Sequence, residues 1–65
     1  MYIIRHKENK NYYKSKISKN MKHFVIDLKE AKKFKTKENA KKILNIFNHP
    51  ENYEILELKE GKLYE

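Results

Sequence analysis

The segment between Thr36 and Pro50 is the clearest secondary-structure signal in the chain, and it constrains the fold most. Its apolar residues recur at i, i+3, i+4 and i+7 and so share one face of a helix, with the lysines outside that face. The Thr36 hydroxyl can cap a helix that begins at Lys37. Pro50 disfavours helical geometry at His49 and so ends the segment. The apolar positions are Ala40, Ile43, Leu44 and Phe47. One amphipathic helix is predicted, and it must bury its apolar face against another element.

The other apolar residues fall in short β-prone runs: residues 2–4, 12–13, 24–26 and 53–58. The first two runs flank the polar residues 7–11 and predict a hairpin. Residues 15–22 are almost entirely polar and predict a loop, whereas residues 28–35 are ambiguous. Residues 53–58 would also suit a helix, but the turn at Pro50 and their short length favour a strand.

These elements predict an α+β fold in which one helix packs across a small antiparallel sheet of three to four strands, in the order β-β-β-α-β. Gly61 is expected to break the last strand and to leave Leu63 and Tyr64 as a frayed tail or a partner contact. The predicted core consists of Ile4, Tyr13, Val25, Phe34, Ile55, the helix face and Ile46.

A chain of 65 residues, of which 38% are hydrophobic and 38% charged, predicts a single domain over residues 1–65 with a small core. Such a core excludes a large enclosed active site. No apolar run is long enough to span a membrane, and residues 1–6 do not resemble a signal peptide, so we expect a cytoplasmic protein. There is no cysteine for a disulfide, which makes homodimerisation a serious possibility.

The charge of +7 is unevenly distributed along the chain. Residues 1–49 contain 14 basic and four acidic residues, a net charge of +10, whereas residues 50–65 contain two basic and five acidic residues, a net charge of −3. A basic body attracts phosphate backbones or acidic protein surfaces. All but one of the basic residues are lysines, which act as point charges and favour phosphate contact over base reading. The alternative is a solvated surface whose basic charge is incidental.

Catalytic and metal-binding patterns are lacking. His6, His23 and His49 have no spacing that forms a metal site in advance. Gly61 is the only glycine, which excludes a glycine-rich phosphate loop, and no combination of nucleophile, base and pocket is recognisable. We therefore expect no enzymatic activity, no metal and no cofactor.

The best candidate binding surface is the pair Tyr12 and Tyr13 with the lysines beside it, Lys14 and Lys16 among them. Aromatic faces stack on bases while ammonium groups meet phosphates. Adjacent strand residues point to opposite faces, so only one of the two tyrosines can lie outside. The lysines of the predicted helix form a second candidate: Lys37, Lys41 and Lys42.

Residues 31–40, Ala-Lys-Lys-Phe-Lys-Thr-Lys-Glu-Asn-Ala, resemble a strand-to-helix junction in which the aromatic residue closes a strand, threonine caps and alanine packs where helix meets sheet. The segment resembles that of the arm-site DNA-binding domains of phage-type integrases, which are similar to plant AP2 domains and lay a three-stranded sheet into the major groove. It is also similar to small orphan proteins of phages and prophages, some of which block defence systems such as CRISPR. The resemblance implies that five residues of the first strands would face the major groove of DNA: Arg5, Lys7, Tyr12, Lys14 and Lys16.

Together these observations predict a small, basic, non-catalytic binding protein of phage or mobile-element type that occupies a nucleic-acid or nucleoprotein surface. It could in this way inhibit a host defence complex of the CRISPR type. The alternative is a protein-only interaction module that forms a homodimer, or adds a strand to a host protein through residues 53–58.

Overall fold

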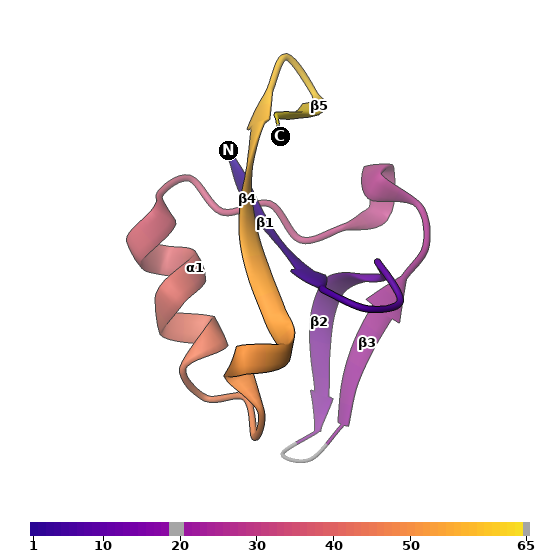
Figure 1. Ribbon diagram of the computed structural model, residues 1–65, viewed down its shortest axis with the longest axis vertical. Helices are drawn as coiled ribbons and strands as arrows, with labels where there is room; N and C mark the ends of the chain where they lie inside the picture. Colours follow the sequence, from indigo (N-terminus) through magenta and orange to yellow (C-terminus); the bar gives the residue numbers. More distant parts are fainter. Residues whose placement is uncertain (19–20, 65) are drawn as a thin grey trace.

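Strand β1 (Tyr2–His6) lies at the centre of one antiparallel sheet. The computed structural model describes residues 1–18 and 21–64, and in this part of the chain the sheet has five strands in the order β3-β2-β1-β4-β5. The other strands are β2 (Tyr12–Ser18), β3 (Met21–Val25), β4 (Tyr53–Lys59) and β5 (Lys62–Tyr64). One α-helix, α1 (Lys37–Leu44), and two short 3-10 helices, η1 (Leu28–Glu30) and η2 (Pro50–Asn52), complete the described elements. Figure 1 shows α1 beside β4 and β1, with the β2–β3 hairpin on the other side.

The α+β class and the single helix are confirmed, but the expected number of strands is too low. The C-terminal residues form β5 rather than a frayed tail, because Glu60 and Gly61 make a two-residue turn with φ angles of 53° and 77°. Turns with positive φ at both central residues match the twist of a β-hairpin. Lys62 and Leu63 therefore pair with Lys59 and Leu58 of β4.

The loop expected over residues 15–22 is wrong where the structure describes it. Residues 15–18 belong to β2 and residues 21–22 to β3, while residues 19 and 20 lie outside the described residues. Polar residues can form these strand segments because they extend beyond the core, with Ser15, Lys16, Met21 and His23 exposed, and a strand of this kind needs no apolar alternation. At the other end, β3 stops at Val25, and Ile26, expected in this strand, is 85% exposed.

Helix α1 begins as expected, and it ends earlier than the sequence indicates. The Thr36 Oγ1 atom accepts a hydrogen bond from the amide of Asn39 at 3.2 Å. After Leu44 the chain forms a turn with hydrogen bonds between residues three positions apart. In this turn the amide of Phe47 donates to the Leu44 carbonyl at 3.0 Å. This turn brings Phe47 into the core and leaves Ile46 56% exposed, so the prediction of Ile46 as a core residue is wrong.

The core has two parts because both faces of β1 are covered: Ile4 faces α1, and Ile3 faces the opposite side. Both side chains are fully buried. The buried residues under α1 are Ile4, Tyr13, Phe34, Ala40 and Phe47, and those on the other face are Ile3, Ala31 and Leu58. The first cluster was largely predicted from the sequence, whereas the second was missed.

Residues 32–34 fill the space where β2 diverges from β1. The two strands pair only at Arg5 and Tyr12. Beyond that point the amide of Lys32 donates to the Tyr13 carbonyl at 2.9 Å, and Phe34 and Tyr2 exchange two backbone hydrogen bonds of 2.7 Å. The connection to α1 therefore joins both halves of the sheet, but Phe34 forms an isolated bridge with Tyr2 and does not close a strand, contrary to the expectation from the sequence.

Candidate functional site

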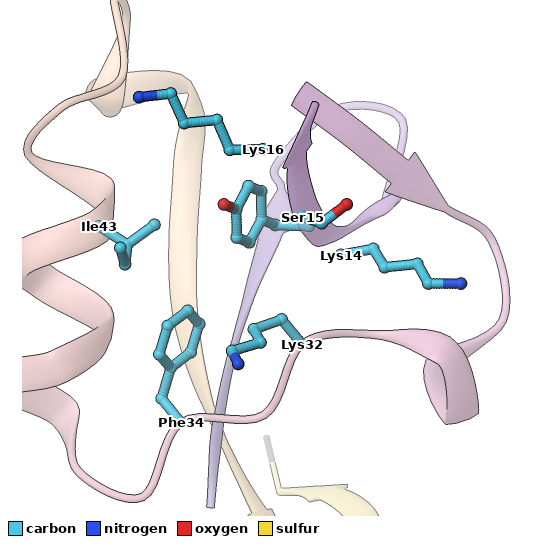
Figure 2. A pocket seen from close by; sticks show the side chains of 7 residues that line it. Lys14, Ser15, Lys16, Lys32, Phe34 and Ile43 are labelled. Carbon is cyan, nitrogen blue, oxygen red and sulfur yellow. The ribbon is translucent and has the colours of Figure 1, made fainter. Parts of the chain in front are cut away.

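A groove of about 230 Å³ lies between β2, α1 and the residues that join η1 to α1. Its apolar lining is provided by Tyr13, Phe34 and Ile43, and its polar lining by Lys14, Ser15, Lys16 and Lys32. Figure 2 shows the ammonium ends of Lys16 and Lys32 directed toward the helix side of the groove, with that of Lys14 directed away. The groove thus combines an apolar floor with a cationic rim.

The pairing of β2 with β3 places two lysines next to each other on the α1 face of the sheet. The register shifts between Tyr13 and Ser15, so that Lys16 stands directly opposite Lys22. Like charges in this position destabilise a strand pair. The Lys22 Nζ atom lies 4.9 Å from the centroid of the Phe47 ring, a cation–π contact that holds its charge against the aromatic core.

The positive charge at this groove is weakly compensated. Among the described residues, Lys16, Lys22 and Lys32 form no ion pair with a carboxylate. Lys14 lies 3.7 Å from Glu30, but both side chains are well exposed, and such pairs contribute little. Twelve of the 15 lysines lie within residues 10–42, together with three acidic residues. This stretch, which includes most of α1, therefore carries most of the positive charge of the chain.

An aromatic cluster supports the groove from below. The ring centroid of Tyr13 lies 5.4 Å from that of Phe47, which in turn lies 4.9 Å from that of Tyr53. Phe24 stacks on Tyr53 at 5.6 Å, and His6 contacts Tyr53 edge-on at 5.0 Å. Burial raises the pKa of Tyr13, so its phenol is neutral at physiological pH. Tyr13, the one member of this cluster that lines the groove, is therefore an uncharged part of its apolar floor.

The structure brings together only some of the residues predicted to bind. Tyr13, Lys14 and Lys16 line the groove, although Tyr13 is mostly buried. Arg5 lies on the opposite face, where its Nε atom donates to the Glu54 carboxylate at 2.9 Å. Tyr12 is half-buried on that face, against the second core cluster, so neither tyrosine of the pair is exposed. The exposed lysines of α1 lie outside the groove lining: Lys37, Lys41 and Lys42.

Sequence reasoning missed five residues of this region. Ser15 and Lys22 were placed in a loop because the polar segments of β2 and β3 were not recognised, and Ile43 was assigned only to the core. Lys32 and Phe34 approach β2 through the hydrogen bond from Lys32 to the Tyr13 carbonyl, which no local pattern indicates. Lys22 could have been predicted at this site only if the polar residues before Phe24 had been interpreted as part of a strand.

A second hollow of about 380 Å³ lies beside the β4–β5 turn. It is lined by Asp27, Leu28, Lys29, Lys33 and Gly61. The Lys33 Nζ atom lies 3.2–3.4 Å from the carbonyl oxygens of Leu28, Lys29 and Ala31, so this ammonium group is engaged by the η1 backbone. Because of these contacts and the carboxylate of Asp27, this hollow is less cationic than the groove.

The histidines have local roles. The Nδ1 atom of His6 accepts hydrogen bonds from the amides of Glu8 and Asn9 at 3.1 and 3.3 Å, which orders the β1–β2 turn. His49 lies 3.4 Å from Glu51 in an exposed pair. Among residues 1–18 and 21–64, no three side chains of the metal-ligating types gather into a group. None of the helices in this same part of the chain has the length and apolar character needed to cross a membrane.

The chain matches no protein family, and comparisons with curated proteins and with solved structures gave no match.

Proposed function

We propose that this chain is a non-catalytic protein that binds the phosphate backbone of a nucleic acid, either free or within a nucleoprotein complex. The observation that carries the proposal is the group of three lysines beside the groove: Lys16, Lys22 and Lys32. None of them pairs with a carboxylate of the described residues, and Lys16 opposes Lys22 across β2 and β3. Lys59 and Lys62 also face each other, on β4 and β5, but they lie within the acidic residues 50–65. Proteins tend to break local rules of stability at functional sites.

A phosphate group supplies the charge that this arrangement lacks. Bound near Lys16 and Lys22, it would replace their mutual repulsion with two attractions, and Lys32 would approach the same strand from the other side of the groove. Lysine ammonium groups do not form the bidentate pairs with which arginine reads guanine. The only arginine, Arg5, is held by Glu54 on the other face. The binding is therefore expected to be largely independent of sequence and sensitive to salt.

Occupation of a nucleoprotein surface has a direct functional consequence. A protein that covers the strand-binding surface of a host defence complex of the CRISPR type excludes the strand by charge and volume, without catalysis. We include this occluding role in the proposal, with the protein acting in the cytoplasm of the host cell as a product of a phage or mobile element. Its test is whether excess protein prevents such a complex from binding its target strand.

The alternative of a protein-only module can no longer use the whole of residues 53–58 for strand addition. Strand β4 pairs with β1 over residues 53–57, and its other edge pairs with β5 over residues 57–59. A partner strand would therefore find only residues 53–56 of that edge open among the described elements. Among the same elements, the free edge of β3 is longer, at five residues.

Fluorescence anisotropy with labelled single-stranded DNA, single-stranded RNA and duplex DNA tests the proposal. With about three phosphate contacts, affinity should fall roughly 40-fold for duplex DNA and roughly 20-fold for the single strands between 50 and 200 mM salt. The double variant Lys16→Glu/Lys32→Glu should abolish most of the binding at either salt concentration.

The matched control is Lys59→Glu/Lys62→Glu, which changes the net charge by the same four units at two exposed positions that face each other on β4 and β5. Its affinity should stay within a few-fold of the wild-type value. Affinity that ignores salt, or an equal loss in the control and in the groove variant, would contradict the proposal.

A further inference from the structure

Strand β3 is an open edge of the sheet. It pairs with β2 on one side, and no strand of the described residues lies on its other side. The register shifts of the hairpin fall within β2, so the five residues of β3 run without interruption. The opposite edge, β5, has only three residues. An uninterrupted edge presents unpaired backbone groups to which another strand can add.

Two of the usual protections of an edge strand, a proline and a bulge within the strand itself, are absent from β3. Its one charged side chain, Lys22, lies over the ring of Phe47 on the α1 face, so one charge protects an edge of five residues. Large apolar side chains are exposed at both ends: Met21 is 59% exposed and Ile26 is 85% exposed. Natural proteins that stay monomeric normally protect such an edge with charge, proline or a covering loop.

The order of residues in β3 is suited to pairing with itself. A two-fold axis requires that the same surface complement itself. With His23 on the axis and antiparallel strands, Met21 faces Val25 of the second copy, and Lys22 faces Phe24 of the second copy. These are an apolar pair on one face of the sheet and a cation–aromatic pair on the other. Both types of cross-strand pair are favourable.

Neighbouring registers are worse. An axis at Lys22 would place two ammonium groups directly opposite each other, which is destabilising. An axis at Phe24 would pair His23 with Val25 of the second copy and leave Met21 without an apolar partner in β3. Only the axis at His23 both separates the lysines and pairs the apolar residues.

We infer that two copies of this chain associate through their β3 edges, antiparallel and with His23 on the two-fold axis, so that one sheet continues across both copies. The inference does not rest on the proposed function, but such a dimer would enlarge the proposed binding surface. The α1 faces of the two sheets lie on the same side of such a dimer, because a two-fold axis perpendicular to the sheet preserves faces. Lys16 and Lys22 of both copies then form one continuous cationic strip.

Salt distinguishes this association from nucleic-acid binding. The two hairpins are both basic, so they repel each other in dilute buffer, and screening of this repulsion should strengthen the dimer. Added salt should weaken nucleic-acid binding instead. The two proposals therefore predict opposite responses to the same change, and either can fail without the other.

Light scattering after size-exclusion chromatography of the full chain gives the first test, at 50 and 500 mM salt over a range of protein concentrations. The mass should rise toward that of a dimer with concentration, and at lower concentration in the higher salt. Met21→Lys should shift the dimer midpoint to at least tenfold higher concentration. Ile46→Lys, which changes a similarly exposed apolar residue away from β3, should leave the midpoint unchanged. Circular dichroism verifies that both variants keep the fold.

Disulfide trapping tests the register, since the chain has no cysteine of its own. Residues directly opposite each other on antiparallel strands have Cβ atoms about 4.5–5.5 Å apart, close to the spacing that a disulfide needs. Under mild oxidation, His23→Cys should cross-link into a covalent dimer at least tenfold faster than Lys22→Cys or Ile46→Cys. A monomeric mass at every concentration and salt, or equal cross-linking rates for the three variants, would overturn the inference.

Discussion

The β1–β4 pair and the β2–β3 hairpin are both antiparallel, but they carry different side chains. Strands β1 and β4 keep one register over five residue pairs, and Ile3 and Ile4 are fully buried on the two faces of β1. The ion pair between Arg5 and Glu54 joins these strands. The hairpin instead has two register shifts and places Lys16 opposite Lys22.

This difference shows how a very small domain can support a surface that does not stabilise it. Domains of this size rarely have more than a few kcal/mol of stability to spare. Apolar burial is concentrated in the central pair and α1. The hairpin is attached to it through Tyr13 and Phe24 in the aromatic cluster and through Tyr12 on the other face. Beyond these residues the hairpin is free to carry charge.

The largest expected effect on stability comes from a substitution in the central strand pair, β1 and β4. Ile4→Ala should destabilise the protein by about 2–5 kcal/mol, because it removes buried methyl groups and leaves a cavity. Ile46→Ala, at an exposed apolar position, should change stability by less than about 0.5 kcal/mol. Urea unfolding followed by circular dichroism measures both, and similar midpoints for the two variants would refute the assignment of the core.

A smaller loss of stability is expected when the ion pair between β1 and β4 is broken. The side chains of Arg5 and Glu54 are only 11% and 28% exposed, so Glu54→Gln should cost about 1–2 kcal/mol through the loss of a charge-assisted hydrogen bond. Glu51→Gln is the control, because Glu51 pairs with His49 at the open surface and should contribute almost nothing. The comparison fails if the two variants unfold at the same urea concentration.

In the hairpin, the expected effect on stability has the opposite sign. Lys16→Glu places a carboxylate opposite Lys22 and should stabilise the protein by about 0.2–1 kcal/mol. The gain should shrink at high salt, because the pair is exposed to solvent. Thermal melts in 20 and 500 mM salt measure the gain, and the anisotropy assay should show weaker binding for the same variant. If Lys16→Glu were less stable than wild type and bound nucleic acid as tightly, Lys16 would contribute to stability and not to binding, contrary to the proposal.

The smallest effect at neutral pH concerns Tyr13, where hairpin and core meet. Burial raises the pKa of Tyr13 in the folded state above its usual value near 10, so the unfolded chain ionises first. The stability contributed by the neutral phenol is complete below pH 10 and is lost as pH rises toward the folded-state pKa. Tyr13→Phe should therefore lose stability less steeply than wild type between pH 9 and 11. Parallel urea midpoints over this range would argue against a buried phenol.

The parts of the fold that were predicted correctly are those set by local residues. The Thr36 cap and the apolar face from Ala40 to Phe47 act within a few residues of each other, and both are observed. The β5 hairpin was missed although Gly61 offered a turn signal, because the preceding Glu60 is not a typical residue for positive φ. The polar strand segments of the hairpin show no alternation, so their pairing could not be inferred.

The candidate site was less predictable than the fold. Lys14 and Lys16 were identified because they follow the tyrosine pair, but Arg5 was selected through a resemblance, and it lies on the other face with Glu54. Lys32 reaches the groove only because its amide hydrogen-bonds to the Tyr13 carbonyl across 19 positions of sequence. Contacts between residues so far apart in the sequence depend on the assembled sheet, and local sequence patterns do not predict them.

The central position of β1 also determines the order in which the structure can form. Arg5 and Glu54 are 49 positions apart in the sequence, so the strand pair that contains the fully buried Ile3 and Ile4 closes the longest loop between paired strands of the described sheet. Closing such a loop is slow compared with forming a hairpin between neighbouring strands. The β2–β3 hairpin can form early, but it has too little apolar surface to persist alone. Lasting structure therefore begins only when β4 docks on β1, and folding should be a single cooperative step whose rate depends on that encounter.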